Sequence, residues 1–267
     1  IVELLSSAKA DIAISMNWLT IIGESVIKCF KYGILNIHPG DLPRYRGNAC
    51  PNWAIINGEE RVGVTIHFME PQALDSGRII CQEYIGLDNT TTIGDIYEKL
   101  YEIVPLMCSR ALSIVCRGMI EGKEQVERGM RCYPRKPCDA RIDWNASCEK
   151  ICRLIRASGK PFSGAYTYIQ NRKMIVEKAS FYFLKEDFYA IPGQIVNVNR
   201  VSDIIDIIAS DGVVRIQSAY FDDEPKTKIT DVIRSTRIRA GYSIEDDIYI
   251  LNKRIERLEK EISELKG

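Results

Sequence analysis

One stretch of this 267-residue chain, residues 33–77, carries an amide, an imidazole and a carboxylate that could act together on an acyl group. Asn36 and His38 end an apolar run, and Asp75 follows a second apolar run. An amide N–H can hold a developing oxyanion. An imidazole with a pKa of about 6.5 can take or give a proton, and a carboxylate can stabilise the imidazolium. Acyl transfer to an amine requires these three groups.

Each residue also has a structural interpretation when it is taken alone. Asn36 could cap the following loop, His38 could be a satisfied loop histidine, and Asp75 is a natural turn residue. Their order within one short segment favours a shared site. His67, the second of only two histidines, lies mid-strand among alternating neighbours. That position predicts a role in the core or behind the site rather than in catalysis.

The apolar runs around these residues predict alternating strands and helices. We expect strands over 10–15, 33–37, 62–69 and 78–85 and helices over 19–30, 48–57 and 92–119. Strand–helix–strand alternation predicts an open, mostly parallel α/β sheet, in which a site lies at the carboxyl ends of the strands. Asn36, His38 and segment 69–75 are expected there.

The second half of the chain has a different pattern. A helix over 145–156 precedes short alternating strands at 164–169, 173–181, 193–198, 204–209 and 213–218, separated by turn residues. This pattern predicts a small, OB-like β-barrel. We therefore expect a catalytic domain over 1–120, a polar linker over 121–139, the barrel domain over 140–240 and a C-terminal helix over 241–267.

The C-terminal segment repeats isoleucine and leucine at spacings of three and four. The repeat consists of Ile248, Leu251, Ile255, Leu258, Ile262 and Leu265. Isoleucine at a and leucine at d favour a parallel two-stranded coiled coil. Arg254 with Glu259, and Glu261 with Lys266, place opposite charges at g and e. Because so few heptads are marginal alone, a helix packed on its own barrel is the alternative to the homodimer that we expect.

The composition limits the classes of partner. Lys+Arg and Asp+Glu both number 36, so no global basic field attracts nucleic acid. No apolar run reaches the roughly 18 residues of a membrane span. The nine cysteines are odd in number and scattered along the chain, which does not fit a disulfide framework. A zinc site would need a second pair of ligands beside Cys148 and Cys152, and the sequence offers none. We expect reduced thiols in a cytoplasmic protein, with no metal and no membrane partner.

Three motifs in this order resemble the signature of the folate-dependent formyltransferases, which act on glycinamide ribonucleotide, methionyl-tRNA or amino sugars. The motifs are Asn36-x-His38, Leu42-Pro43-x-x-Arg46-Gly47 and Leu74-Asp75-Ser76-Gly77. In place of the family's usual Ser-Leu-Leu-Pro the chain has Gly40-Asp41-Leu42-Pro43. The second half resembles the C-terminal domain of the tRNA and sugar enzymes through Arg135-Lys136-Pro137-x-Asp139-x-x-Ile142-Asp143-Trp144 and Gly164-Ala165-Tyr166-Thr167-Tyr168.

The resemblance implies a Rossmann-like sheet and transfer of a formyl group from N10-formyltetrahydrofolate to an amine. It implies Asn36, His38 and Asp75 as the catalytic residues. Members usually carry a longer segment before the Asn-x-His strand than the 35 residues found here. We therefore expect this chain to be part of a longer protein, lacking the amino-terminal part of the sheet.

The resemblance also implies the residues around the two substrates. The candidate folate-pocket residues are Trp18, Met69, Glu70 and Leu74, although Trp18 could equally belong to the core. Arg44 and Arg46, with Gly47, could hold a phosphate or shape the loop. For Arg46 we favour the structural role.

The acceptor is less constrained than the formyl donor. A nucleotide-linked amino sugar is favoured because segments 17–18, 40–43 and 65–67 look more like the sugar enzymes. The even charge balance and the acidic clusters Glu186-Asp187 and Asp222-Asp223-Glu224 argue against methionyl-tRNA, the first alternative. Glycinamide ribonucleotide is disfavoured because its enzymes usually lack the second domain. A non-catalytic binding module and a formyl-folate hydrolase are the further alternatives.

Overall fold

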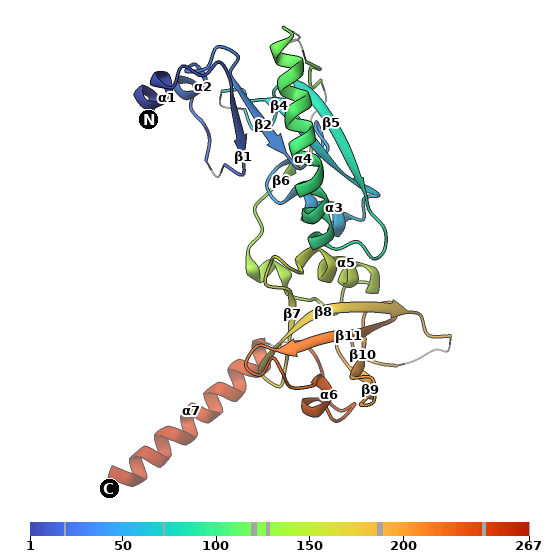
Figure 1. Ribbon diagram of the computed structural model, residues 1–267. Helices are drawn as coiled ribbons and strands as arrows, with labels where there is room; N and C mark the ends of the chain where they lie inside the picture. The colour runs from blue at the N-terminus through green and yellow to red at the C-terminus, as the bar shows by residue number, and fades with distance from the viewer. Residues whose placement is uncertain are drawn as a thin grey trace. The chain divides into compact units, whose positions relative to one another are not determined.

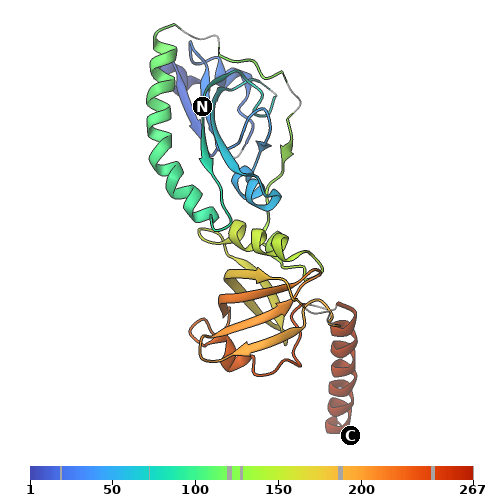
Figure 2. The ribbon, with the colours of Figure 1, turned by 90° about the vertical axis from the view of Figure 1, so that its right-hand side faces the viewer.

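The structure, a computed structural model, describes residues 1–18, 20–71, 73–118, 122–126, 129–185, 189–241 and 244–266. It divides into two compact units, Ile1–Ala140 with Arg156–Ser163 and Arg141–Ile155 with Gly164–Gly267. Both are drawn in Figures 1 and 2, coloured along the chain. Each unit has its own cluster of buried apolar side chains, so each is described by itself.

A four-stranded sheet in the order β1-β2-β4-β5 forms the centre of the first unit (Figure 1). Its strands are β1 (Ala13–Met16), β2 (Ile34–His38), β4 (Arg61–Phe68) and β5 (Ile79–Gly86). β1 and β2 are parallel, whereas β4 is antiparallel to both β2 and β5. The mixed α/β class is confirmed, but the prediction of a mostly parallel sheet is wrong.

The direction of β4 follows from the connection that precedes it. A parallel crossover must return the chain to the starting end of the first strand. Helix α3 (Cys50–Asn57) has eight residues and rises about 12 Å. β4 instead starts beside the end of β2, so that Thr65 pairs with His38 and Phe68 pairs with Leu35. The whole connection therefore stays at the end of the sheet where β2 finishes.

Helix α4 (Ile93–Cys116) covers one face of this sheet (Figures 1 and 2). Thr92 and Asp95 form a capping box at its start, in which each side chain bonds the other's main-chain N–H. Its buried positions recur at spacings of three and four: Ile93, Ile96, Leu100, Val104, Met107, Ala111 and Val115. This stripe packs into the core that contains the apolar residues of β2 and β4.

Alternation along β2 sends its polar residues to the face away from α4. Leu35 and Ile37 belong to the core. Because side chains alternate along a strand, Asn36 and His38 face the other side. The loop over residues 39–45 covers part of that side, where the Gly40 carbonyl accepts a hydrogen bond from β4. The polar residues are thus enclosed between the sheet and a loop.

The remaining elements of the first unit are short. They are α1 (Val2–Ser7), α2 (Glu24–Ile27), β3 (Arg46–Gly47), β6 (Arg131–Cys132) and the 3-10 turn η1 (Pro137–Ala140). The helix predicted over 19–30 is reduced to α2, because Gly23 sits at its N-cap in an extended conformation; Leu19 lies outside the described residues. β3 and β6 pair in parallel, and neither was predicted.

The second unit contains a five-stranded antiparallel sheet in the order β7-β8-β11-β10-β9. Its strands are β7 (Ala165–Ile169), β8 (Arg172–Tyr182), β9 (Ile195–Asn199), β10 (Ile204–Ile208) and β11 (Val213–Phe221). The sheet does not close into the predicted OB-like barrel, because β7 and β9 form its two edges in the described chain. Single bridges join Ile169 to Ala240 and Gln194 to Arg239. The segment around residues 239–240 therefore occupies the gap between the edges.

Two helices complete the core of the second unit. α5 (Cys148–Ser158) buries Cys148, Ile151, Cys152 and Ile155 in that core, and α6 (Ile229–Val232) buries Ile229. Residues 156–158 of α5 are assigned to the first unit. The polar cluster on β2 lies wholly in the first unit, so the second unit supplies none of its side chains.

The C-terminal segment forms one helix, α7 (Ile244–Lys266). Its described isoleucine and leucine side chains are each about half exposed. The coiled coil itself stays a prediction. None of the described helices is both long and apolar enough to cross a membrane.

Candidate active site

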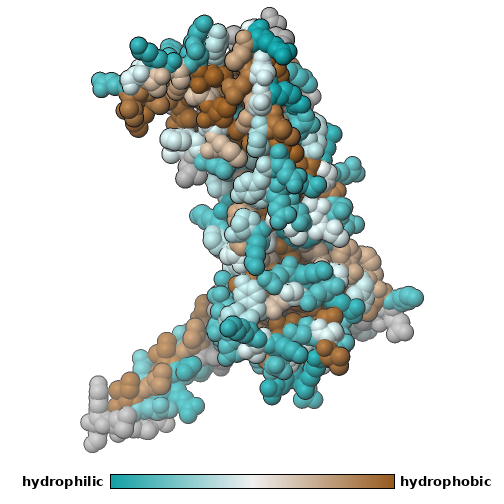
Figure 3. All heavy atoms as spheres, in the orientation of Figure 1, coloured by the Kyte–Doolittle hydropathy of each residue, from teal (hydrophilic) through white to brown (hydrophobic). Residues whose placement is uncertain are grey.

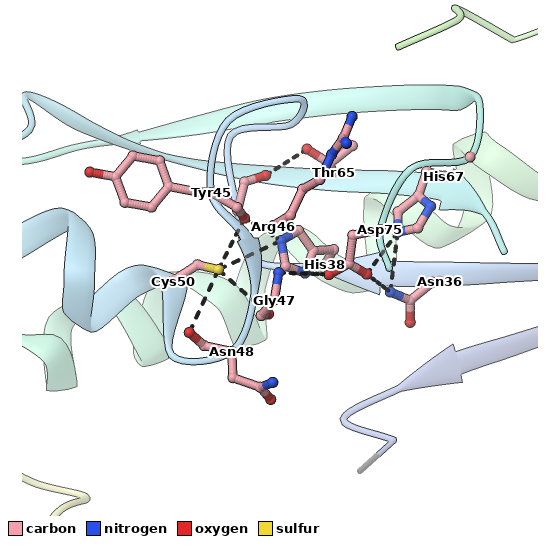
Figure 4. Close-up of polar contacts among 12 residues, drawn as sticks. Asn36, His38, Tyr45, Arg46, Gly47, Asn48, Cys50, Thr65, His67 and Asp75 are labelled. Carbon is pink, nitrogen blue, oxygen red and sulfur yellow. Dashed lines mark hydrogen bonds and ion pairs between the residues drawn. The ribbon is translucent and has the colours of Figure 1, made fainter. Parts of the chain in front are cut away.

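Asn36 and His67 lie directly opposite each other on β2 and β4 (Figure 4). Directly paired residues of antiparallel strands share a face, with Cβ atoms about 5 Å apart. Asn36 Nδ2 is 3.2 Å from His67 Nε2. His67 Nδ1 is 2.7 Å from the Phe68 carbonyl oxygen. Because a carbonyl only accepts hydrogen bonds, Nδ1 carries a hydrogen, and Nε2 lies where it can accept from the Asn36 amide.

Asp75 enters the same cluster from the loop after β4. Its φ of +46° lies in the left-handed region, which aspartate adopts more readily than most residues. The Gly47 N–H donates to its Oδ2 at 2.8 Å, and Asn36 Nδ2 donates to its Oδ1 at 3.3 Å. Gln125 Nε2 donates to its main-chain oxygen at 3.0 Å. Contacts from three other segments therefore hold the carboxylate toward Asn36.

His38 lies behind Asp75 and is 4% exposed. Its Nδ1 is 3.6 Å from Asp75 Oδ2, and its Nε2 is 2.7 Å from the Tyr45 carbonyl oxygen. Nε2 therefore carries the hydrogen, and Nδ1 is the atom that can gain a proton. Burial lowers the pKa of His38, and the nearby Asp75 charge offsets that effect only in part. The neutral ring is thus the favoured resting form.

The surroundings of Asp75 favour the ionised carboxylate. Burial alone raises its pKa, but His67 and His38, when either ring carries a proton, and the Gly47 N–H outweigh burial and lower the pKa below its ordinary value. His67 Nε2 lies 3.4 Å from Asp75 Oδ1. An ionised Asp75 is therefore placed to stabilise a proton on either imidazole.

Two glycines of the loop motif stand where a side chain would collide with the site. A Cβ at Gly40 would overlap His38 Nε2 and the Tyr45 oxygen. Gly47 has a φ of +103°, and a Cβ there would overlap the Cys132 main-chain oxygen. The loop can therefore approach the His38 ring and offer its Gly47 N–H to Asp75 because these positions have no side chain.

The two loop arginines contact other protein groups. Arg44 is 2.6 Å from Glu59 Oε1, in an ion pair that is partly exposed. Arg46 donates to Gln125 Oε1 at 2.9 Å, and the Gln125 amide donates in turn to the Asp75 and Gly77 oxygens. Arg46 thus fixes the side chain that holds the Asp75 loop. For both arginines, phosphate binding stays a prediction.

The candidate folate residues lie on the segments that border the site. Trp18 is 63% exposed and Leu74 is 41% exposed, so Trp18 does not belong to the core. Met69 donates its main-chain N–H to the Ile34 oxygen at 2.8 Å, which ties the loop to β2. Glu70 is exposed at the start of that loop. Their contact with a pterin stays a prediction.

Two residues of the cluster were not predicted as site residues. His67 contacts both Asn36 and Asp75, and an antiparallel pairing of residues 62–69 with 33–37 would have placed it opposite Asn36. Gln125 belongs to segment 121–139, which was predicted as a linker. Its role depends on a turn of the chain that no sequence pattern marked. Residues 121, 127 and 128 of that segment lie outside the described residues.

Cys50 is a buried thiol beside this cluster. Its Sγ donates to the Tyr45 oxygen at 3.0 Å and lies 3.7 Å from His38 Nε2. A hydrogen bond with the Cys132 thiol and burial raise its pKa, so Cys50 stays protonated and is a poor nucleophile. Among the residues that the structure describes, no group of three or more His, Cys, Asp or Glu side chains could hold a metal ion.

The chain is similar to known proteins along most of its length. Residues 1–112 match the formyl transferase family, and residues 135–237 match the formyl transferase C-terminal domain. The methionyl-tRNA formyltransferase of Clostridium tetani (strain Massachusetts / E88) is 30% identical over 91% of this chain and 77% of that protein. The bifunctional polymyxin resistance protein ArnA of Wigglesworthia glossinidia brevipalpis is 34% identical over 74% of this chain. This match covers 30% of ArnA, so the chain corresponds to less than a third of that relative.

Solved structures share the fold at lower identity. HypX from Aquifex aeolicus, in complex with tetrahydrofolic acid, has a TM-score of 0.63 and 22% identity over 87% of this chain and 41% of that chain. The N-formyltransferase from Helicobacter canadensis, in complex with folinic acid and dTDP-3-aminofucose, has a TM-score of 0.60 and 20% identity over 78% of this chain and 73% of that chain. At these identities the likeness concerns the fold.

Proposed function

This chain belongs to the formyl transferase family of enzymes, and we propose that it transfers a formyl group from N10-formyltetrahydrofolate to the primary amine of a nucleotide-linked amino sugar. The observation that carries the proposal is the meeting of Asn36, His38 and Asp75 at the end of β2. The folate co-substrate is supported by the folate compounds bound in the two structural relatives. The proposed reaction uses no metal.

The reaction forms one C–N bond and breaks another. The acceptor amine attacks the formyl carbon, and the formyl oxygen becomes an oxyanion. The bond from that carbon to N10 of the folate then breaks, giving the formylated amine and tetrahydrofolate. The amine must lose a proton and N10 must gain one. The site therefore has to stabilise the oxyanion and to move a proton.

Asn36 is proposed to stabilise the oxyanion through its Nδ2 hydrogens. The two hydrogens currently face Asp75 Oδ1 at 3.3 Å and His67 Nε2 at 3.2 Å. An amide oxygen in this place would face the Asp75 carboxylate, so the donor orientation is electrostatically favoured. One of the two hydrogens must turn from its present partner to the formyl oxygen in the transition state.

His38 and Asp75 are proposed to carry the proton. Asp75 is more accessible than the His38 ring behind it, whose Nδ1 is 3.6 Å from Asp75 Oδ2. A proton from the attacking amine passes along Asp75 to the neutral His38, directly or through a water, and the carboxylate stabilises the imidazolium. The same route returns a proton to N10 of the folate.

His67 is proposed as a positioning residue. Its Nε2 accepts one Asn36 hydrogen and so fixes the amide. The same Nε2 atom lies 3.4 Å from Asp75 Oδ1, so the ring also borders the carboxylate that Asn36 contacts. His67 therefore acts on the reaction through the Asn36 amide.

An amino sugar is favoured as the acceptor by the structural relative that holds dTDP-3-aminofucose. Methionyl-tRNA is the alternative, since the relative from Clostridium tetani is named for it. A tRNA-binding enzyme needs a basic surface, and the chain has equal numbers of acidic and basic residues. The acidic cluster at 222–224 contributes less net negative charge against tRNA binding than the sequence suggested, because Arg172 pairs with Asp223 and Glu224. Glu186-Asp187 lies outside the described residues.

The assembly and location are also proposals. A homodimer through α7 accounts for the exposed apolar residues of that helix. A cytoplasmic location is supported by the cysteines, since none of the nine, all of which lie in the described residues, forms a disulfide.

The acceptor class is tested by incubating the protein with N10-formyltetrahydrofolate and one acceptor at a time. The acceptors are dTDP- and UDP-linked amino sugars and methionyl-tRNA, and the products are identified by mass. A formylated sugar nucleotide is the expected result. Formylmethionyl-tRNA as the sole product would contradict the sugar proposal but would still agree with the proposed active site. Formate with no formylated acceptor would indicate a hydrolase, and tight folate binding without any product would indicate a binding module.

A further inference from the structure

Helix α7 carries a stripe of exposed apolar side chains. Five of them lie at the heptad positions a and d, and their exposed fractions are 53% for Ile248, 54% for Leu251, 52% for Ile255, 47% for Leu258 and 50% for Ile262. Figure 3 shows apolar side chains gathered along this helix, with hydrophilic ones beside them. Single exposed apolar residues are ordinary, whereas a contiguous row marks an interaction surface.

The width of the stripe indicates what kind of surface covers it. A helix that packs on a globular core usually has a third apolar position in each heptad, at e or g. In α7 these flanking positions are Asn252 and Glu259 at e and Arg254 and Glu261 at g. A stripe restricted to a and d fits one other helix with the same repeat.

We propose that α7 pairs with α7 of a second copy of this chain as a parallel, in-register, two-stranded coiled coil. The a positions 248, 255 and 262 are isoleucine, and the d positions 251 and 258 are leucine. This combination favours two parallel strands over trimers and tetramers. A second copy supplies the matching repeat without any other partner.

The charges beside the stripe agree with this arrangement. In a parallel pair, each g residue lies beside the e residue of the next heptad on the other helix. Arg254 then faces Glu259 of the partner subunit. By sequence, the same rule sets Glu261 opposite Lys266 of the partner subunit. Both contacts join opposite charges, and the two-fold symmetry of the pair doubles each of them.

An antiparallel pair would bring different residues together. In that geometry g faces g, so Arg254 would meet Glu261 of the partner subunit and not Glu259. The two orientations therefore respond differently to a charge swap between Arg254 and Glu259. Neither orientation involves Asn36, His38 or Asp75, so this proposal stands apart from formyl transfer.

The oligomeric state is tested by sedimentation equilibrium of the full chain over a wide range of concentrations. The wild-type protein should show a monomer–dimer equilibrium. Leu258→Asp, which places a charge at d, should give a monomer throughout. Lys253→Asp, at the outward position f, is the matched control and should retain the dimer. A wild-type monomer at every concentration, or a dimer that survives Leu258→Asp, would overturn the proposal.

The orientation is tested by a charge swap that leaves the apolar stripe intact. Arg254→Glu should weaken the dimer about fivefold to tenfold by setting two glutamates against each other. The double variant Arg254→Glu/Glu259→Arg should restore the wild-type dissociation constant. If the double variant stays as weak as Arg254→Glu, the parallel register is wrong. Circular dichroism of each variant shows whether the helix has been retained.

Discussion

Asn36 is the residue whose loss should affect the reaction most directly, because its amide is the group proposed to hold the oxyanion. Removing one such donor typically lowers kcat by about 10²–10³. Asn36→Ala should show a loss of this size in single-turnover transfer, with little change in folate affinity. Asn57→Ala is the matched control, since that amide contacts the Tyr45 hydroxyl away from the cluster. Equal rates for Asn36→Ala and the control would remove Asn36 from the mechanism.

His38 should set the acid side of the pH profile. Burial lowers its pKa from the ordinary 6.5. A general base must be unprotonated, so kcat at saturating folate and acceptor, which does not report the free acceptor amine, should begin to fall only below pH 6.5 as the solution is acidified. An acid limb centred above pH 6.5 would contradict a buried His38 as the base.

The same shift has a consequence for stability. The folded protein disfavours the proton on His38, so the unfolded chain binds more protons between the lowered pKa and 6.5. The free energy of unfolding should therefore decrease as the pH falls below 6.5. Urea unfolding at a series of pH values should show a shallower decrease for His38→Asn than for the wild type. Equal slopes would show that His38 keeps an ordinary pKa in the folded state.

His67 should affect the rate through Asn36 rather than through the substrate. His67→Leu removes the Nε2 acceptor that fixes the Asn36 amide, and the loss of one such hydrogen bond should lower kcat by about tenfold. His67→Gln keeps an acceptor and should recover part of that loss. KM for the folate should be unchanged in both variants. A raised KM with an unchanged kcat would instead indicate a direct contact with the substrate.

At the scale of elements, the loop between β2 and α3 depends on glycine. Gly47→Ala would place a side chain at a φ of +103° against the Cys132 oxygen. Strain of this kind costs about 1–3 kcal/mol. We expect a loss of that size in the free energy of unfolding. We also expect lower activity, because the hydrogen bond from the Gly47 N–H to Asp75 is displaced.

Gly86→Ala supplies the matched comparison. Gly86 ends β5, and a Cβ there would meet no atom within 4 Å. The two variants are compared by urea unfolding and by transfer rate. If Gly47→Ala were as stable and as active as Gly86→Ala, the loop would not be the rigid support for Asp75 that its contacts indicate.

The elements also show how far the sequence predicts this structure. The strand that carries Asn36 and His38 was predicted to within one residue, because a short apolar run between turn residues is a local signal. The direction of β4 was not predicted, since it depends on where the preceding loop ends and not on the pattern within the strand. That error hid the pairing of His67 with Asn36.

The open sheet of the second unit illustrates the same limit. Its five strands were each located by alternation, whereas closure depends on whether the edges β7 and β9 meet. The segment around residues 239–240 lies between those edges, and no local sequence pattern predicted that position. Gln125 is a similar case. It lies in a polar segment, and polar composition alone does not distinguish an exposed linker from a segment that contacts the Asp75 loop.

At the scale of the whole molecule, the charge balance predicts a weak dependence on salt. A protein that contacts about 6–10 phosphates loses roughly 10³–10⁵ in affinity between about 50 and 200 mM salt. With 36 acidic and 36 basic residues, and a sugar nucleotide with few phosphates, KM for the acceptor should change by less than about tenfold over this range. A steep loss would favour tRNA as the acceptor.

The most direct test of the site is single-turnover release of tetrahydrofolate from N10-formyltetrahydrofolate with a saturating amino-sugar nucleotide. Wild type, His38→Ala and Asp75→Asn are compared, and each variant is first shown to bind the folate. We expect release by the wild type that depends on the acceptor, and almost none from either variant. Release at the wild-type rate by His38→Ala would contradict proton transfer through His38, whatever the acceptor proves to be.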